Sequence, residues 1–169
     1  MGAYQLLRPL LFATDPERAH DFAIRSGEAL SASAGLCSYV AARCRITDPR
    51  LRTRVAGMDM ANPIGLAAGF DKSARAVPFL SALGFGHVEV GSISADASAG
   101  NPRPRLFRLP DERAIVVNYG LPNDGAGRVG ERLWRTHVLS AVGANIVSTN
   151  HGPGVPMPND DDVIRDYVH

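Results

Sequence analysis

The chain contains a single lysine, Lys72, at the end of a run of small and apolar residues that begins at Gly65. Lysine and arginine together number 18, so every other residue of this type is an arginine. A compact ammonium on a flexible stem reaches into a small polar site as a point charge, whereas the planar guanidinium of arginine needs more room. Lys72 is therefore a candidate for a role that arginine does not fill, although one lysine can also survive by chance.

Short apolar segments followed by polar loops would bring Lys72 together with other reactive side chains. Strands are predicted at residues 64–68, 87–90, 115–117 and 144–147, and helices between them at 73–83 and 126–138. This alternation predicts βαβ units and a parallel sheet, in which ligands bind at the carboxyl ends of the strands. Any one of the loops that follow, taken alone, is better interpreted as a plain turn. Together they predict one site, formed by residues 69–72, 91–92, 118–120 and 148–150.

The first 45 residues have a different texture and are predicted to form a small helical region ahead of residues 46–169. A helix is predicted at 4–12, and a third at 36–44. Between them, the sequence from Thr14 to Glu17 resembles a capping box with Pro16 in the first turn. One face of this second helix is predicted to hold five small or apolar residues: Ala19, Phe22, Ala23, Ser26 and Leu30. Such amphipathic, cationic helices either pack on a neighbouring domain or lie on an anionic membrane surface.

The composition indicates a globular protein of about one domain, with 169 residues of which 45% are hydrophobic. A formal net charge of +1 argues against a nucleic-acid-binding field over the whole molecule. Cys37 and Cys44 lack a partner at metal-ligand spacing and are interpreted as thiols in a reducing compartment. The acidic run 160–162 is interpreted as a solvated helix start. No metal site, signal peptide or membrane span is predicted.

Three long motifs in the correct order resemble one enzyme family. They are Asn-Pro-Ile-Gly-Leu-Ala-Ala-Gly-Phe-Asp-Lys at 62–72, Gly-Phe-Gly-His-Val-Glu-Val-Gly-Ser at 84–92 and Gly-Asn-Pro-Arg-Pro-Arg-Leu-Phe-Arg-Leu-Pro at 100–110. The chain resembles dihydroorotate dehydrogenase, and within that family the quinone-linked, membrane-associated class. That class carries a small helical domain ahead of its barrel, which meets the membrane and admits quinone.

The resemblance implies a (β/α)8 TIM barrel that binds FMN and oxidises dihydroorotate to orotate in the biosynthesis of pyrimidines (UMP). Ala67, Ala68 and Gly69 would let the flavin approach the backbone, and Lys72 would serve both the flavin and the orotate carboxylate. Ser92 would supply a hydroxyl to the flavin in place of the family's usual threonine, and Asn145 an amide that donates and accepts. The implied location is peripheral, on the cytoplasmic side of the cell membrane.

The substrate loop departs from the family pattern of Asn-Arg-Met-Gly-Phe-Asn-Asn. The residues implied to bind orotate are Lys72 and, in the loop, Asn118, Tyr119, Gly120, Leu121 and Asn123. Asn118 stands one position late, and a slip of one residue on a strand points a side chain to the other face. Pro122 removes an amide, and Val147-Ser148 stands where the family commonly has Gly-Lys. These departures leave room for a substrate other than dihydroorotate.

A (β/α)8 barrel usually needs about 250 residues, so residues 46–169 are expected to form an incomplete, half barrel. The family's catalytic base is a serine after the fifth strand, and no catalytic residue is assigned among residues 1–169. Three hypotheses stay open: a dihydroorotate dehydrogenase whose remainder lies elsewhere, a non-catalytic half-barrel interaction module, and a flavin-binding protein of altered specificity. An open sheet edge also predicts association with a second copy or with the missing half.

Overall fold

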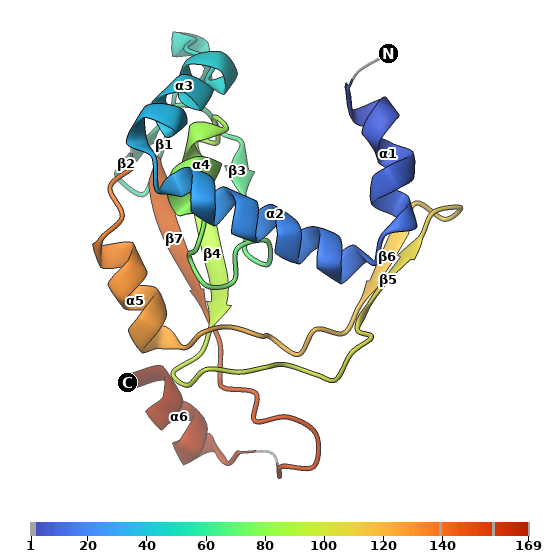
Figure 1. Ribbon diagram of the computed structural model, residues 1–169. Coiled ribbons are helices and arrows are strands. Elements are labelled where there is room, and N and C mark those ends of the chain that lie inside the picture. The colour runs from blue at the N-terminus through green and yellow to red at the C-terminus, as the bar shows by residue number, and fades with distance from the viewer. Residues whose placement is uncertain (1–2, 139, 157, 169) are drawn as a thin grey trace.

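A computed structural model describes residues 3–138, 140–156 and 158–168 (Figure 1). The helices are α1 (Ala3–Ala13), α2 (Pro16–Ser31), α3 (Ala34–Cys44), a short 3-10 helix (Pro49–Leu51), α4 (Val77–Ala82), α5 (Ala126–Trp134) and α6 (Asp160–Val168). The strands are β1 (Thr53–Val55), β2 (Met58–Met60), β3 (Gly65–Leu66), β4 (His87–Ile93), β5 (Leu106–Leu109), β6 (Ala114–Val117) and β7 (Ala141–Ile146). No helix among these residues is long and apolar enough to cross a membrane.

The central sheet is parallel and has the strand order β3–β4–β7. Strand β4 alternates over its first four residues, so that Val88 and Val90 are fully buried while His87 and Glu89 are partly exposed on the other face. This sheet confirms the predicted strands at 64–68, 87–90 and 144–147, although β3 is shorter and the other two begin or end elsewhere. Strands β3 and β4 thereby place the loops that follow them at one end of the sheet.

The predicted strand at 115–117 exists, but its assignment to the parallel sheet was wrong. Strand β6 pairs antiparallel with β5 in a separate hairpin, with Leu106 opposite Val117. All four residues of β6 are exposed, whereas a central strand of a parallel sheet is buried on both faces. A short apolar run alone does not distinguish these two cases. The described part of the chain therefore holds three parallel barrel strands rather than four, and Asn145 lies on the third.

Helix α4 is shorter than the predicted helix at 73–83 because its N-terminal segment is held in a loop by Asp71. The carboxylate of Asp71 is buried and accepts hydrogen bonds from the backbone N–H groups of Ser73, Arg75 and Ala76 at 2.7–3.3 Å. Ala74 has a φ of 54°, which no α-helix accommodates. This loop brings Lys72 back toward the end of the sheet.

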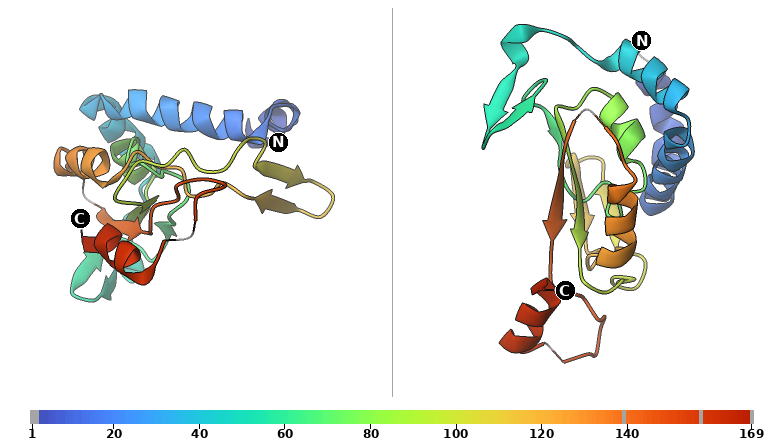
Figure 2. Two further views of the ribbon diagram at one scale, coloured as in Figure 1. Left: turned by 90° about the horizontal axis from the view of Figure 1, so that it is seen from below. Right: turned by 90° about the vertical axis from the view of Figure 1, so that its left-hand side faces the viewer.

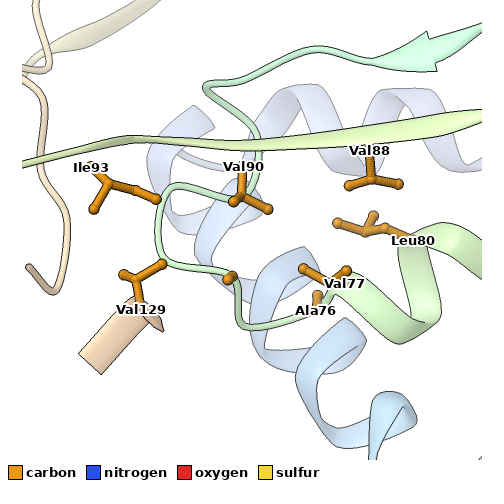
Figure 3. Close-up of a cluster of buried hydrophobic side chains, with 8 residues drawn as sticks. Ala76, Val77, Leu80, Val88, Val90, Ile93 and Val129 are labelled. Carbon is orange, nitrogen blue, oxygen red and sulfur yellow. The ribbon is translucent and has the colours of Figure 1, made fainter. Parts of the chain in front are cut away.

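One hydrophobic core joins the sheet to the helices beside it (Figure 3). Val77 and Leu80 of α4 pack against Val88 and Val90 of β4, and Val129 of α5 closes the cluster near Ile93. Helix α4 in turn lies between the sheet and the N-terminal helices α2 and α3 (Figure 2). The N-terminal region therefore packs directly on the barrel segment.

Helix α2 differs from its prediction at its start and in its buried face. Asp15, not Thr14, is the N-cap, and its carboxylate accepts from the N–H of Arg18 at 2.9 Å. Glu17 does not close a capping box, because its side chain is buried against other partners. The buried residues of α2 are Glu17, Ile24 and Gly27. Phe22, which lies on the predicted apolar face of this helix, is 73% exposed.

Candidate functional site

Six of the predicted site residues line one open pocket of about 400 Å³ at the carboxyl end of the sheet. Val117, at the end of β6, is the seventh residue of the lining, and the predicted ones are Gly69, Lys72, Ser92, Tyr119, Gly120 and Leu121. The sheet supplies the first three and the β5–β6 hairpin leads into the others. The loops predicted to converge therefore do so for three of the four, although the third arrives from a hairpin.

Lys72 is the cation of this pocket. Its Nζ donates to the backbone carbonyl of Gly69 at 2.6 Å and lies 4.3 Å from the ring centroid of Tyr119. Partial burial lowers the pKa of Lys72, and the nearby Arg105 guanidinium lowers it further. An ammonium has three N–H donors, and the Gly69 carbonyl uses one of them. Lys72 is thus held in place and keeps donors for an anionic ligand.

Tyr119 lies beneath two cations. The Arg105 guanidinium carbon is 5.1 Å from the ring centroid, and each such contact is attractive because the face of the ring is negative. Burial raises the pKa of the Tyr119 phenol, and the Glu17 carboxylate adds to this effect. Within the described residues the buried hydroxyl has no hydrogen-bond partner. A protonated phenol without a partner is suited to donate to an acceptor on a ligand.

Ser92 and Asn145 meet at the ends of β4 and β7. The Ser92 hydroxyl donates to Oδ1 of Asn145 at 2.5 Å, and Nδ2 of Asn145 donates to Glu89 at 3.3 Å. A Cβ on Gly91 would lie 2.4 Å from the backbone carbonyl oxygen of Asn145, so a glycine is needed where these neighbouring strands approach each other. The pair presents a hydroxyl and an amide beside the pocket.

The backbone from Ala67 to Gly69 follows β3 directly. Ala67 is exposed and Ala68 is half-buried, and a Cβ added to Gly69 would meet no atom within 4 Å. The φ of Gly69 is 105°, a conformation that side chains rarely adopt, so the glycine is required by the backbone rather than by packing. The strand end therefore stays uncovered on the side where the predicted flavin would approach.

Asn118 and Asn123 lie outside this pocket, unlike the rest of their loop. Asn118 is exposed and its Oδ1 accepts from Nδ2 of Asn101 at 3.0 Å. Asn123 is buried, and its amide binds Ser94 and the N–H of Gly125. Strand β6 ends at Val117, so Asn118 follows the strand and is exposed. Tyr119 occupies the position nearest to Lys72 instead.

Two residues that sequence reasoning did not single out complete the arrangement. Arg105 is buried and joins the hairpin to Glu17 of α2 through two N–H donors at 2.8 and 3.0 Å. A second cleft of about 250 Å³ lies on this side and shares Lys72 and Tyr119 with the pocket. Nothing in the sequence links residues 88 positions apart, so no local signal would have found this pair.

The donor set of the pocket fits an anionic, conjugated group such as a flavin with a carboxylate ligand. It combines an uncovered backbone at residues 67–69, one ammonium, the Ser92–Asn145 pair and the unpartnered Tyr119 hydroxyl. No cluster of three metal-ligating side chains occurs among the residues that the structure describes. The chemistry available to these residues is therefore anion binding and hydrogen bonding to a ring system.

A parallel sheet with helices on one face and a pocket at its carboxyl end is the arrangement found in a segment of a TIM barrel. The family model described as dihydroorotate dehydrogenase matches residues 50–161. The chain belongs to the dihydroorotate dehydrogenase family.

Relatives and solved structures agree with this assignment. The chain is 48% identical to a protein of Natronomonas pharaonis over 161 residues, and 44% identical to one of Thermobifida fusca over 166 residues. Both are named dihydroorotate dehydrogenase (quinone), and the matches cover 95% and 98% of this chain but 44% of each relative. The chain thus spans less than half the length of these curated relatives. A crystal structure of the Eimeria tenella enzyme in complex with ferulenol matches the chain with a TM-score of 0.68 and 32% sequence identity. The match covers 89% of this chain and 39% of the Eimeria tenella chain.

Proposed function

We propose that this chain forms the first part of the flavin and substrate site of a quinone-dependent dihydroorotate dehydrogenase, which oxidises dihydroorotate to orotate. The observation that carries the proposal is the single pocket in which Gly69, Lys72, Ser92 and Tyr119 lie together. Its support from relatives is identity above 40% to proteins named for this reaction. When bound, FMN supplies the two-electron acceptor that links dihydroorotate to quinone.

The residues of the chain bind and orient in this proposal. Lys72 binds the orotate carboxylate and compensates negative charge on the flavin, while the Gly69 carbonyl holds its ammonium in place. The Ser92 hydroxyl and the Asn145 amide bind the polar edge of the flavin from two neighbouring strands. Ala67 and Ala68 keep the approach to the strand end free of bulk. The proton acceptor of the reaction is assigned to none of these residues.

Tyr119 is the residue of the substrate loop that lies against Lys72. Its ring centroid lies 4.3 Å from Nζ of Lys72, and in our proposal its buried hydroxyl donates to an oxygen of orotate. Gly120 and Leu121 line the same wall of the pocket. Asn118 and Asn123 bind orotate only after the loop rearranges, because their amides contact other parts of the chain.

The N-terminal helices are proposed to contact the membrane and to admit quinone, from the cytoplasmic side. The support is a set of exposed apolar side chains on α1 and α2. Those at least half exposed are Tyr4, Leu6, Leu7, Leu10 and Phe22. Arg108 donates to the carbonyls of Leu11 and Thr14 at 2.9 Å, which joins the end of α1 to the hairpin beside the pocket.

Replacing Lys72 with alanine tests the proposed site. We expect the affinity of the purified chain for orotate, measured by calorimetry in the presence of FMN, to fall about tenfold to a hundredfold, because a charged hydrogen bond contributes roughly 1.5–3 kcal/mol. Arg135→Ala is the matched control, since Arg135 is 75% exposed and, among the described residues, forms an ion pair only with Glu131 of the adjoining helix α5. Unchanged affinity of the Lys72 variant for both FMN and orotate would exclude the role.

A further inference from the structure

The side chain of Arg105 closes the base of the β5–β6 hairpin. Its Nη1 donates to three backbone carbonyls, those of Ala99, Asn101 and Tyr119, at 2.6, 2.8 and 3.3 Å. The backbone carbonyl of Arg105 also accepts from the N–H of Asn118 at 2.8 Å. One buried residue thus fixes both ends of the segment that leads into the substrate loop.

Glu17 of α2 holds Arg105 in this position. A single carboxylate oxygen of Glu17 accepts from Nε and Nη2 of Arg105, and the same oxygen forms an ion pair with Nη2 of Arg103 at 2.9 Å. The side chains of Arg105 and Glu17 are only 8% and 6% exposed. The guanidinium uses one edge for Glu17 and its remaining nitrogen for the carbonyls, a division that a lysine cannot reproduce. Without Glu17, a buried cation loses its counter-ion.

The same guanidinium lies over the ring of Tyr119, and the ring in turn lies beneath Lys72. The contacts form one continuous chain from Glu17 through Arg105 and Tyr119 to Lys72. Of these four residues, the first belongs to the N-terminal helices and the last two line the pocket. The N-terminal region therefore touches the pocket through defined side chains rather than through general packing.

We propose that Glu17 and Arg105 are positioning residues for the substrate site: Glu17 orients Arg105, and Arg105 sets the placement of Tyr119 against Lys72. The inference rests on the proposed function for its catalytic meaning, since Lys72 and Tyr119 are the groups that meet the substrate there. It adds that the geometry of the pocket depends on helix α2. Neither Glu17 nor Arg105 contacts the substrate in this account.

The test uses the fact that the chain has one lysine. Selective labelling of lysine at Cε gives a single side-chain NMR signal for Lys72. Its Hε protons lie near the ring of Tyr119 and carry a ring-current shift, which Tyr119→Leu should abolish. We expect Glu17→Gln and Arg105→Lys to move this signal toward that of free lysine. A merely structural role of the pair would leave the shift in place.

Asp21→Asn is the matched control, because Asp21 lies one helical turn after Glu17. The substitution removes one negative charge, as Glu17→Gln does. Asp21 pairs with Arg103 at 3.3 Å and has no contact with Arg105 among the described residues. We expect this variant to keep the ring-current shift of Lys72. A Glu17→Gln signal that matches that of Asp21→Asn and of the unaltered chain would overturn the proposal.

Hydrogen exchange provides a second reading that does not depend on the lysine signal. Asn101 and Asn118 donate their backbone N–H groups to Tyr119 and to Arg105, at 2.9 and 2.8 Å. Glu17→Gln should accelerate exchange at these two amides and leave exchange at the amides of β4 unchanged. Equal protection of the two amides in Glu17→Gln and in the unaltered chain would contradict the proposal. If Glu17→Gln fails to fold, Arg105→Lys gives the same comparison with the charge retained.

Ligand binding separates this inference from the proposed function. The two measurements above require no ligand, so they stand even if the unaltered chain binds neither FMN nor orotate, a result that would reject the proposed function alone. Where orotate binds, Glu17→Gln should weaken its binding by about tenfold, because the displaced Lys72 then makes a weaker charge-assisted contact with orotate. An unchanged orotate affinity together with a displaced Lys72 signal would overturn the claim that the placement matters for substrate.

Discussion

At the scale of single residues, the pocket depends on how Lys72 is surrounded. The ammonium is partly desolvated and close to Arg105, yet the Gly69 carbonyl and the face of Tyr119 stabilise its charge. Desolvation strengthens the attraction between such a cation and an anionic ligand, because less water lies nearby to screen the interaction between the two charges. The type and position of Lys72, Gly69 and Ser92 could be predicted from the sequence, since small residues and a lone cation mark such loops. The direction of Asn118 could not, because it depends on where β6 ends.

The lowered pKa of Lys72 leads to a prediction for pH dependence. Below its pKa the ammonium is charged and attracts orotate; above it the attraction is lost. Because the pKa of Lys72 in the free chain is lowered, binding should begin to weaken at a pH below that of an exposed lysine, about 10.4. Calorimetric titrations between pH 7 and 10.5 measure this, with the Lys72→Ala variant as the baseline for titration of the ligand itself. Equal pH profiles for both proteins would contradict it.

At the scale of secondary-structure elements, local sequence signals predicted which helices and strands exist better than they predicted what each of them packs against. The parallel strands and the helices between them follow from alternating short apolar runs and turn residues. The acidic run at 160–162 was correctly interpreted as a helix start, since these residues form the first turn of α6. The hairpin placement of β6 and the buried face of α2 were not predictable, because each is decided by partners distant in sequence. The apolar Phe22 is exposed and the charged Glu17 is buried, which is the reverse of what their polarity indicates.

Helix α1 provides the prediction for this scale. Leu7→Asp and Leu10→Asp replace exposed apolar side chains, so they should leave the fold intact and lower binding to anionic phospholipid vesicles in a sedimentation assay. Each leucine that becomes buried in the lipid contributes roughly 1.5–3 kcal/mol to binding. The double variant should therefore lose at least tenfold in its partition coefficient between water and vesicles. Val168→Asp on α6, where Val168 is 81% exposed, is the control. Vesicle binding that falls equally in both proteins would place the contact elsewhere.

At the scale of the whole molecule, the fold is an incomplete barrel with one face covered by helices and the other partly open. Val142 and Ile146 of β7 are 38% and 62% exposed, and several apolar side chains of the β5–β6 hairpin are also exposed. The order of strands and helices made the parallel sheet predictable, whereas the incomplete barrel was predicted from the family resemblance and the length of the chain. The joining of α2 to the hairpin by Glu17 and Arg105 was not, because a buried ion pair between distant segments leaves no periodic trace in the sequence.

The central claim is that this segment forms a working dihydroorotate dehydrogenase site. Its most direct test is a chimera in which residues 1–169 replace the matching segment of the Thermobifida fusca relative, to which 98% of the chain aligns. We predict a flavin-containing protein that oxidises dihydroorotate with quinone, and whose kcat/KM falls about tenfold to a hundredfold when Lys72 is replaced with alanine. A folded, flavin-loaded chimera whose flavin is not reduced by dihydroorotate would contradict the account.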